Sequence, residues 1–193
     1  APTVDAEVPE RQGVFYALFL IAMAGLLGIT LTGDVFNVFV FLEISSLATY
    51  GLIAHGRDRR ALLAAFRYLI TGTVGATFLL IGIAFLYILT GSLNMVDLAA
   101  KYARHRVGKG GSVGILASPA SRKIRLFERA FEAQGISVIW PDCDAEMIMA
   151  IRQIKAGGPV PKARTALMQA SLELVENGAE LQFIACSEFS LIA

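Results

Sequence analysis

Residues 14–31 read VFYALFLIAMAGLLGITL, an apolar run without a charged side chain. Two further apolar runs follow, VFNVFVFLEISSLATYGLIA at residues 35–54 and a third at residues 61–89, each with one charged residue. A helix needs about 20 apolar residues to cross the hydrocarbon core of a bilayer. The runs therefore predict three membrane-spanning helices, at about residues 14–31, 35–55 and 61–89. The alternative is that the runs form buried helices of a soluble core. Three such runs in succession argue against it.

Composition divides the chain into two unlike parts. Of the 193 residues, 55% are hydrophobic and the mean hydropathy is +0.61, which is high for a soluble globular protein. Charged residues are sparse up to residue 103 and denser from Arg104 onward. We therefore predict a membrane segment at residues 1–103, a Gly-rich basic linker or fusion seam at residues 104–111, and a soluble part at residues 112–193. The net charge of +1 gives no field that favours nucleic acid, so no nucleic-acid partner is expected.

The basic residues between the second and third runs predict the orientation in the membrane. Arg57, Arg59 and Arg60 should lie on the cytoplasmic side. The third span then leaves the membrane on the opposite face, which places the soluble part outside the cytoplasm. Basic residues between positions 101 and 106 argue against this exit. The expected location is a multi-pass protein of the inner (plasma) membrane, with the side of the soluble part left open.

Two charged residues lie inside the predicted spans. Glu43 is near the middle of the second span, and Arg67 is about two turns into the third. A charge at bilayer depth costs roughly 2.5 to 3.5 kcal/mol on insertion scales, so it usually faces a partner or a hydrated path. One interpretation is a structural ion pair or an arginine that reaches to the membrane surface. The other is a proton or cation relay in which Arg67 sets the pKa of the Glu43 carboxyl.

These residues belong to two stretches that resemble a known family of membrane proteins. The stretches are FYALFLIAMAGLLGITLTGDVFNVFVFLEISSLATYGLIAHG and AAFRYLITGTVGATFLLIGIAFLYILTGSLNMVDLA, within about residues 11–103. They closely resemble antiporter-like membrane subunits, such as the D-type subunits of multisubunit sodium/proton antiporters and the proton-pumping subunits of respiratory complex I. The resemblance implies a proton path through Glu43, a basic residue at Arg67, and partners among the other subunits of such a complex and the lipid bilayer. Members of the family have many more helices than three.

From Ser112 the pattern changes to short apolar runs that alternate with amphipathic segments. The runs predict strands at residues 112–118, 137–142 and 181–186, and helices at residues 121–135, 145–155 and 163–177. This alternation predicts a flavodoxin-like α/β half-domain with a short parallel sheet. Parallel sheets bind ligands at the carboxyl ends of their strands. Ser118, Cys143 and Cys186 fall there.

The two cysteines, Cys143 and Cys186, form neither a disulfide framework nor a metal-ligand spacing, so no metal site is predicted. A cysteine at a strand end is a candidate nucleophile or acid/base, because its thiol can be tuned to a thiolate. A small buried hydrophobic residue is the alternative, since free cysteine is often buried. Position alone leaves the two interpretations of Cys186 equal, and we interpret Cys143 as structural.

The soluble part in turn resembles the C-terminal half of the aspartate/glutamate racemase family. The resemblance rests on VGILASPASRKIRLFERAFEAQGISVIWPD and on ELVENGAELQFIACSEFSLI, at the end of the chain. It implies an enzyme without a cofactor, in which two lobes each supply one cysteine and the pair moves the α-proton of a small acidic amino acid. Cys186 matches the second cysteine and Glu188 the acid of the aspartate-type pattern. Ser118 and Ser187 stand where threonines help to hold the substrate.

These resemblances leave three hypotheses for function. The first is a fragment of a proton-translocating cation/proton antiporter subunit fused to a racemase-like lobe and inactive alone. The second is an amino-acid racemase half, an isomerase that uses Cys186 and needs a complementary lobe from another chain. The third is a membrane-anchored module that binds a small acid without converting it. Because each half begins or ends inside its family and the chain has no initiator Met, we expect a piece of a longer protein or a spliced reading frame.

Overall fold

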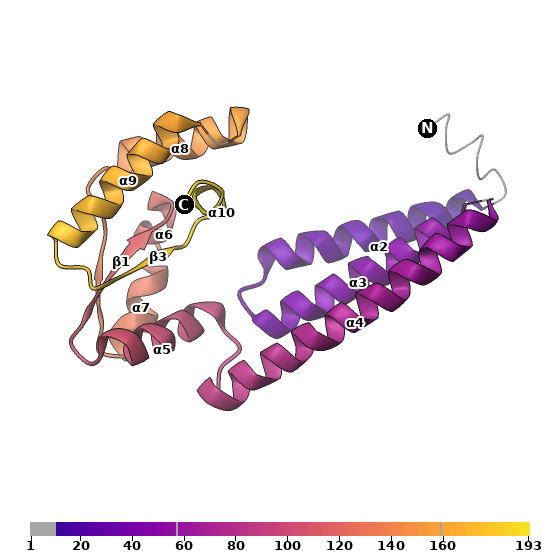
Figure 1. Cartoon of the computed structure of the whole chain (residues 1–193), viewed down its shortest axis with the longest axis horizontal. Helices are drawn as coiled ribbons and strands as arrows, with labels where there is room; N and C mark the ends of the chain where they lie inside the picture. The colour runs from indigo at the N-terminus through magenta and orange to yellow at the C-terminus, as the bar shows by residue number, and fades with distance from the viewer. Residues whose placement is uncertain (1–10, 57, 159) are drawn as a thin grey trace. The chain divides into compact units, whose positions relative to one another are not determined.

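The chain folds into two compact units that divide between Met95 and Val96. The computed structural model describes residues 11–56, 58–158 and 160–193. The first unit consists of long helices, and the second alternates strands and helices (Figure 1). The predicted change of fold along the chain is therefore confirmed. Arg57, which contributed to the predicted orientation, lies outside the described residues.

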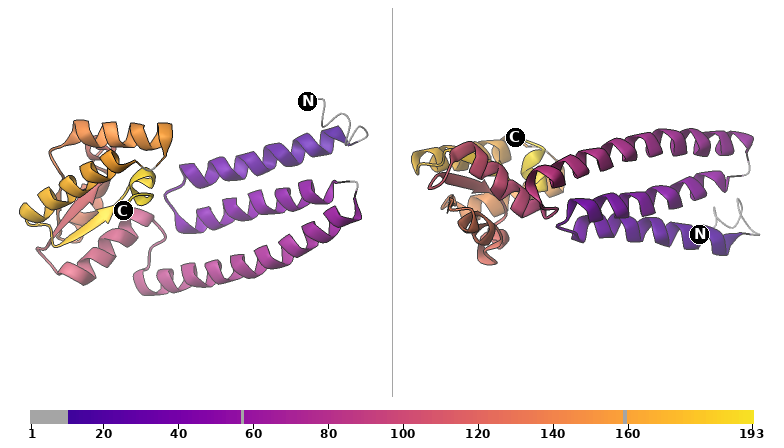
Figure 2. Two further views of the ribbon diagram at one scale, coloured as in Figure 1. Left: turned by 45° about the horizontal axis from the view of Figure 1, so that its top comes forward. Right: turned by 90° about the horizontal axis from the view of Figure 1, so that it is seen from below.

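The first unit contains the three predicted membrane helices. They are α2 (Gln12–Leu31), α3 (Val35–Ala54) and α4 (Arg59–Thr90), of 20, 20 and 32 residues, and all three are long and apolar enough to cross a membrane. They lie side by side in both views of Figure 2. Only 11 to 17% of the residues in their apolar windows are buried within the protein. Apolar side chains on all sides of a helix are typical of a membrane span.

Small residues allow α2 and α3 to approach closely. A side chain at Gly25 would clash with the backbone of Phe41 and Ser45, and one at Gly28 would overlap the ring of Phe41. Close packing at small residues is the usual way that membrane helices associate, because lipid gives no hydrophobic drive between them. The α2–α3 pair is thus built for van der Waals contact.

The second unit contains a parallel sheet of three strands. The strands are β1 (Ser112–Leu116), β2 (Ser137–Ile139) and β3 (Leu181–Ile184), in the order β2-β1-β3. The helices are α5 (Met95–Val107), α6 (Pro119–Lys123), α7 (Leu126–Ala133), α8 (Asp144–Gly157), α9 (Pro161–Glu176) and α10 (Ser187–Ser190). The predicted α/β class with a short parallel sheet is confirmed.

Helices cover both faces of this sheet. On one face α5 and α7 pack against Val113 and Ile115 of β1, and on the other face α8 and α9 pack against Leu116 (Figure 1). Successive side chains of a strand point to opposite faces, so β1 contributes to both hydrophobic clusters. Gly114 lets α9 come close, because a Cβ at this position would lie 2.8 Å from Leu174. The central strand is therefore buried on both sides, as in doubly wound folds.

The structure breaks the helix that the sequence predicts at residues 121–135. It consists of α6 and α7, separated at Ile124 and Arg125. Arg125 has a positive φ of 53°, and its guanidinium pairs with Glu132 at 3.0 Å. Ile124 is 63% exposed, so it does not pack against the sheet. The break turns α7 so that Phe127 and Phe131 reach the sheet.

Residues 104–111 also differ from the flexible linker that their composition predicts. Residues 104–107 form the last turn of α5, and the backbone N–H of Gly110 donates to the carbonyl of Gly135. In α5, Ala100 and Ala103 are fully buried against the sheet. The amphipathic face of α5 explains the difference, since its alanines complete the hydrophobic cluster beside β1. The helix that ends the antiporter-like stretch is thus part of the α/β unit.

Candidate functional site

Cys186 lies at the carboxyl edge of the sheet, immediately after β3. Ile184 at the end of β3 is paired with Leu116 at the end of β1, and the N–H of Ala185 donates to the carbonyl of Leu116 at 2.9 Å. Cys186 and Ser118 each follow this pair by two residues. Ligand sites in open parallel sheets form at this edge. The fold therefore places two of the predicted site residues at the same edge of the sheet.

Glu188 is the direct partner of the Cys186 thiol. The thiol donates a hydrogen bond to Oε2 of Glu188 at a sulfur–oxygen distance of 3.0 Å. The hydroxyl of Ser187 donates to the same oxygen, also at 3.0 Å. Both donors and the acceptor come from one short segment, the residue before α10 and the first two residues of that helix. The sequence predicts Cys186 and Glu188 as a catalytic pair, and in the structure they are in contact.

A third side chain of this cluster, Lys155, was not predicted. Its Nζ lies 3.2 Å from Oε1 of Glu188, whose side chain is 19% exposed. Lys155 stands in the last turn of α8. Two helices, α8 and α9, join β2 to β3, and their packing places this turn near Glu188. A lysine before a Gly-Gly helix stop has no distinctive sequence signal, so only this packing reveals it.

The cluster sets opposite pKa shifts on its two acidic groups. The hydrogen bond from Cys186, the N–H of Glu188 itself and the Lys155 ammonium lower the pKa of Glu188 to about 2. Burial, and then the hydrogen bond to Glu188, raise the pKa of Cys186 above its usual value of 9.0. Near neutral pH the carboxylate is therefore ionised and the thiol keeps its proton. The acid of this site is therefore the Cys186 thiol, and the charged Glu188 carboxylate holds it in place.

We predict that Glu188→Gln increases the rate of Cys186 alkylation. Without the carboxylate, the pKa of Cys186 falls toward its usual value, so a larger fraction is thiolate and reactive at a given pH. The measurement is the rate of iodoacetamide labelling between about pH 7 and pH 10 in a Cys143→Ser background. The mid-point of the profile should move to lower pH in Glu188→Gln. An unchanged or higher mid-point would contradict the role assigned to Glu188.

The two serines of the predicted substrate site have local partners in the structure. The Ser118 hydroxyl accepts a hydrogen bond from the N–H of Ala120 at 3.2 Å and caps the N-terminus of α6. The Ser187 hydroxyl donates to Glu188. Both residues lie at the carboxyl edge of the sheet, so their predicted contact with a substrate carboxylate stays a prediction.

Cys143 follows β2 at the same edge but has a different partner. It stands just before α8 and packs against the hydrophobic cluster that also contacts Cys186. Burial, and then the negative charge of Glu173, raise its pKa. Glu173 also accepts the N–H of Asp142 at 2.8 Å, which fixes the carboxylate in place. Our interpretation of Cys143 as a structural residue stays a prediction.

Glu43 and Arg67 are not paired in the first unit. Tyr50 of α3 packs edge to face on Tyr68 of α4, with ring centroids 4.9 Å apart, and its hydroxyl lies over Gly72. Arg67 is therefore level with Tyr50, whereas Glu43 lies seven residues, or about 10 Å, further along the axis of α3.

The direction of side chains on helices increases this separation. Helical side chains lean toward the N-terminus of their own helix, and α3 and α4 run antiparallel. Glu43 and Arg67 thus lean away from each other. Within residues 11–56, 58–158 and 160–193, no ion pair joins them. A proton path through Glu43 and Arg67 stays a prediction. Such a path would need other groups to carry the proton between these two side chains.

The described part of the chain contains no cluster of three or more His, Cys, Asp or Glu side chains that could hold a metal ion.

Two family models match the chain, and they overlap. A model described as NADH:quinone oxidoreductase/Mrp antiporter, TM, matches residues 32–118. A model described as Asp/Glu/Hydantoin racemase matches residues 92–193. The overlap contains α5 and β1, the two elements that begin the α/β unit.

Known relatives match about half of the chain. The N-type NADH-quinone oxidoreductase subunit of Desulforudis audaxviator is 61% identical over 98 residues, which are 51% of this chain and 19% of that protein. The D-type Na(+)/H(+) antiporter subunit of Alkalihalophilus pseudofirmus is 37% identical over 114 residues, 59% of this chain and 22% of that protein. A solved chain of the membrane-bound sulfane sulfur reductase, an archaeal respiratory membrane complex, is 41% identical over 46% of this chain and 18% of its own, with a TM-score of 0.43. The chain thus spans about a fifth of the length of these relatives.

Proposed function

Because the chain belongs, through residues 92–193, to the Asp/Glu/Hydantoin racemase family, we propose that its α/β unit carries one proton-transfer half of a cofactor-independent amino-acid racemase. The observation that carries the proposal is the 3.0 Å hydrogen bond from the Cys186 thiol to Glu188. A thiol at the carboxyl edge of a parallel sheet, with a charged acceptor fixed beside it, is suited to acid/base chemistry.

In this proposal Cys186 is the proton donor of the resting site. Its raised pKa keeps the thiol protonated, so it can deliver a proton to an α-carbanion that forms on its side of the substrate. The S–H bond breaks as the new C–H bond forms, and a thiolate remains. In the reverse direction the same raised pKa makes the thiolate a stronger base, which the weakly acidic α-proton of an amino acid requires.

Glu188 and Lys155 support this chemistry from behind the thiol. The hydrogen bonds from Cys186 and from the backbone N–H of Glu188, with the ammonium of Lys155, keep Glu188 ionised, and the carboxylate holds the S–H bond in one direction. A donor that is already oriented lowers the activation free energy, because less entropy is lost in reaching the reactive geometry. Ser118 and Ser187, at the same edge, are the proposed contacts of the substrate, a small acidic amino acid.

Inversion requires a second acid/base on the opposite face of the substrate, which a complementary lobe would supply. The chain alone should therefore exchange the α-proton without inverting the carbon. The test follows the α-proton signal of L- and D-aspartate and of L- and D-glutamate by NMR in D₂O with the full chain. Exchange of one enantiomer without inversion supports the proposal. Binding without exchange, at any pH from about 7 to 10, would favour a module that only holds the acid.

A second candidate function belongs to the membrane unit. We propose that α2, α3 and α4 form a piece of a cation/proton antiporter-like subunit, favoured by the 61% identity to an N-type NADH-quinone oxidoreductase subunit. Glu43, half-buried on α3, is the proposed proton carrier, because an intramembrane carboxylate usually marks such a path. Arg67 belongs to the proposed path at its membrane-surface end.

This second candidate implies partners and a location. Other subunits of a multisubunit complex would supply the remaining groups of the path, and three spans would make the chain a multi-pass protein of the plasma membrane. The relatives' names describe subunits of an oxidoreductase and of an antiporter, which supports the partner subunits. Ion flux across the membrane of reconstituted vesicles is then expected only when the partner subunits are present. Flux with the chain alone would show that the partner subunits are not required.

A further inference from the structure

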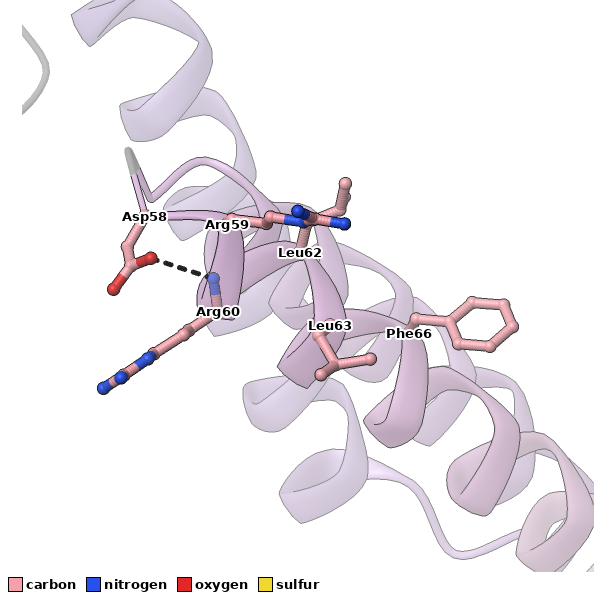
Figure 3. Close-up of a pocket in the computed structure, with 6 residues that line it drawn as sticks. All are labelled: Asp58, Arg59, Arg60, Leu62, Leu63 and Phe66. Atoms are coloured by element: carbon pink, nitrogen blue, oxygen red, sulfur yellow. Dashed lines mark hydrogen bonds between the residues drawn. The ribbon is translucent and has the colours of Figure 1, made fainter.

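Arginines are concentrated at the beginning of α4. Arg59, Arg60 and Arg67 are exposed, and among the described residues none of them takes part in an ion pair. The nearest acid along the chain, Asp58, uses one carboxylate oxygen to accept the backbone N–H of Arg60 at 3.0 Å and so caps the helix. Figure 3 shows this bond, with the side chains of Arg59 and Arg60 leaving the first turn in different directions.

The packing of α3 on α4 fixes the depth of these arginines. The 20 residues of α3 rise about 30 Å, which matches the thickness of the hydrocarbon core. Since Arg67 is level with Tyr50, it lies near the C-terminal end of α3, and Arg60 lies two helical turns further out. Side chains lean toward the N-terminus of their helix, so both guanidinium groups point to the headgroup region.

The two arginines line one groove. They are seven residues apart, so they lie on the same face of α4. Ala64 is between them, and its small side chain leaves the space open. The groove has a volume of about 610 Å³ and is completed by Leu63, Tyr68 and Thr71. A second hollow, of about 840 Å³, adjoins it at Arg60 and Leu63 (Figure 3). Its other lining residues are the charged Asp58 and Arg59 and the apolar Leu62 and Phe66.

We propose that this groove binds the headgroup of an anionic phospholipid, with the phosphate over Ala64 between Arg60 and Arg67. Two guanidinium groups supply the paired N–H donors that phosphate oxygens accept, and the tyrosine and threonine hydroxyls add neutral partners. The inference goes beyond the proposed function, and it pairs Arg67 with a lipid phosphate rather than with Glu43. It requires only that α4 crosses the bilayer.

The surface below the groove fits an acyl chain. Deeper along the same side of α4, Gly75 and Gly82 have open space where a Cβ would stand, and Phe78 is 70% exposed. A lipid anchored at the two arginines would extend along this shallow apolar surface. A free phosphate ion would make no contact with this apolar surface. An exposed apolar surface below a basic pair is a feature of lipid-facing interfaces. These observations favour a phospholipid over a soluble anion.

The test measures how strongly the full chain prefers an anionic lipid. The chain is reconstituted in phosphatidylcholine vesicles with trace spin-labelled phosphatidylglycerol or phosphatidylcholine, and electron paramagnetic resonance gives the motionally restricted fraction of each. Arg60→Gln and Arg67→Gln should each reduce the preference about fivefold, the effect of about 1 kcal/mol per basic residue near the membrane surface. The double variant Arg60→Lys with Arg67→Lys should keep part of it, because charge remains but paired donors are lost.

Arg59→Gln is the matched control. It removes the same charge from the same turn of α4 and lines the adjoining hollow but not the groove, so it should reduce the preference clearly less than Arg60→Gln does. An equal loss in Arg59→Gln would indicate diffuse attraction and overturn the site, as would wild-type preference in Arg67→Gln. Displacement of the lipid by millimolar inorganic phosphate would assign the groove to a free anion instead. Carbonate extraction and circular dichroism establish separately that each variant is inserted and helical.

Discussion

Cys186→Ser should reduce α-proton exchange by about 100-fold or more, which is the usual contribution of a positioned acid/base. Serine keeps the size of the side chain and its hydrogen bond to Glu188, but a hydroxyl is a far weaker acid than a thiol. The stability of the α/β unit should therefore change little, since Cys186 is only partly buried at the edge of its cluster. Deuterium incorporation into the substrate, measured by NMR, gives the rate.

The control for this prediction is Cys143→Ser. Cys143 follows the neighbouring strand, faces Glu173 and has no contact with Glu188 among the described residues. Exchange at the wild-type rate is expected in this variant. If Cys143→Ser lost exchange and Cys186→Ser kept it, the assignment of the acid/base would be reversed. If both kept it, exchange would not depend on a thiol and the racemase proposal would fail.

Ala103→Asp should unfold the α/β unit or destabilise it by about 3 kcal/mol or more. Ala103 is fully buried between α5 and the sheet, where a carboxylate would be left without a partner. A domain with the usual stability of about 5–15 kcal/mol cannot absorb many such changes. Trp140, the single tryptophan of the chain, packs beside Phe127 in the same cluster, so its fluorescence during urea unfolding reports on this unit alone.

His105→Asp provides the comparison on the same helix. His105 is exposed, and an acid there meets only the unfavourable C-terminal end of the helix dipole, which costs about 0.3 to 1 kcal/mol. A cost of the same size in both variants would mean that α5 is not part of the folded α/β unit. A large difference would establish that residues matched by the antiporter model complete the core of the racemase-type lobe.

The site illustrates what a residue pattern can and cannot locate. Cys186 and Glu188 are two residues apart after an apolar run, so their proximity follows from local geometry, and the predicted pair is in contact. Lys155 comes from a helix 33 residues away along the chain, and it reaches Glu188 only because α8 packs beside α10. Glu43 and Arg67 show the converse, since the sequence marks both as charges inside neighbouring spans, and no ion pair joins them among the described residues.

The sequence by itself determined the two classes of fold. The length of an apolar run and the alternation of strands and helices are local properties, because bilayer thickness and backbone geometry fix them residue by residue. Tertiary structure alone decided where the units divide and which charges meet. The boundary lies at the first residue of α5 rather than at the Gly-rich residues 104–111, since Ala100 and Ala103 of α5 are buried in the same hydrophobic cluster as β1. Burial and register depend on partners distant in the chain, and no local pattern encodes them.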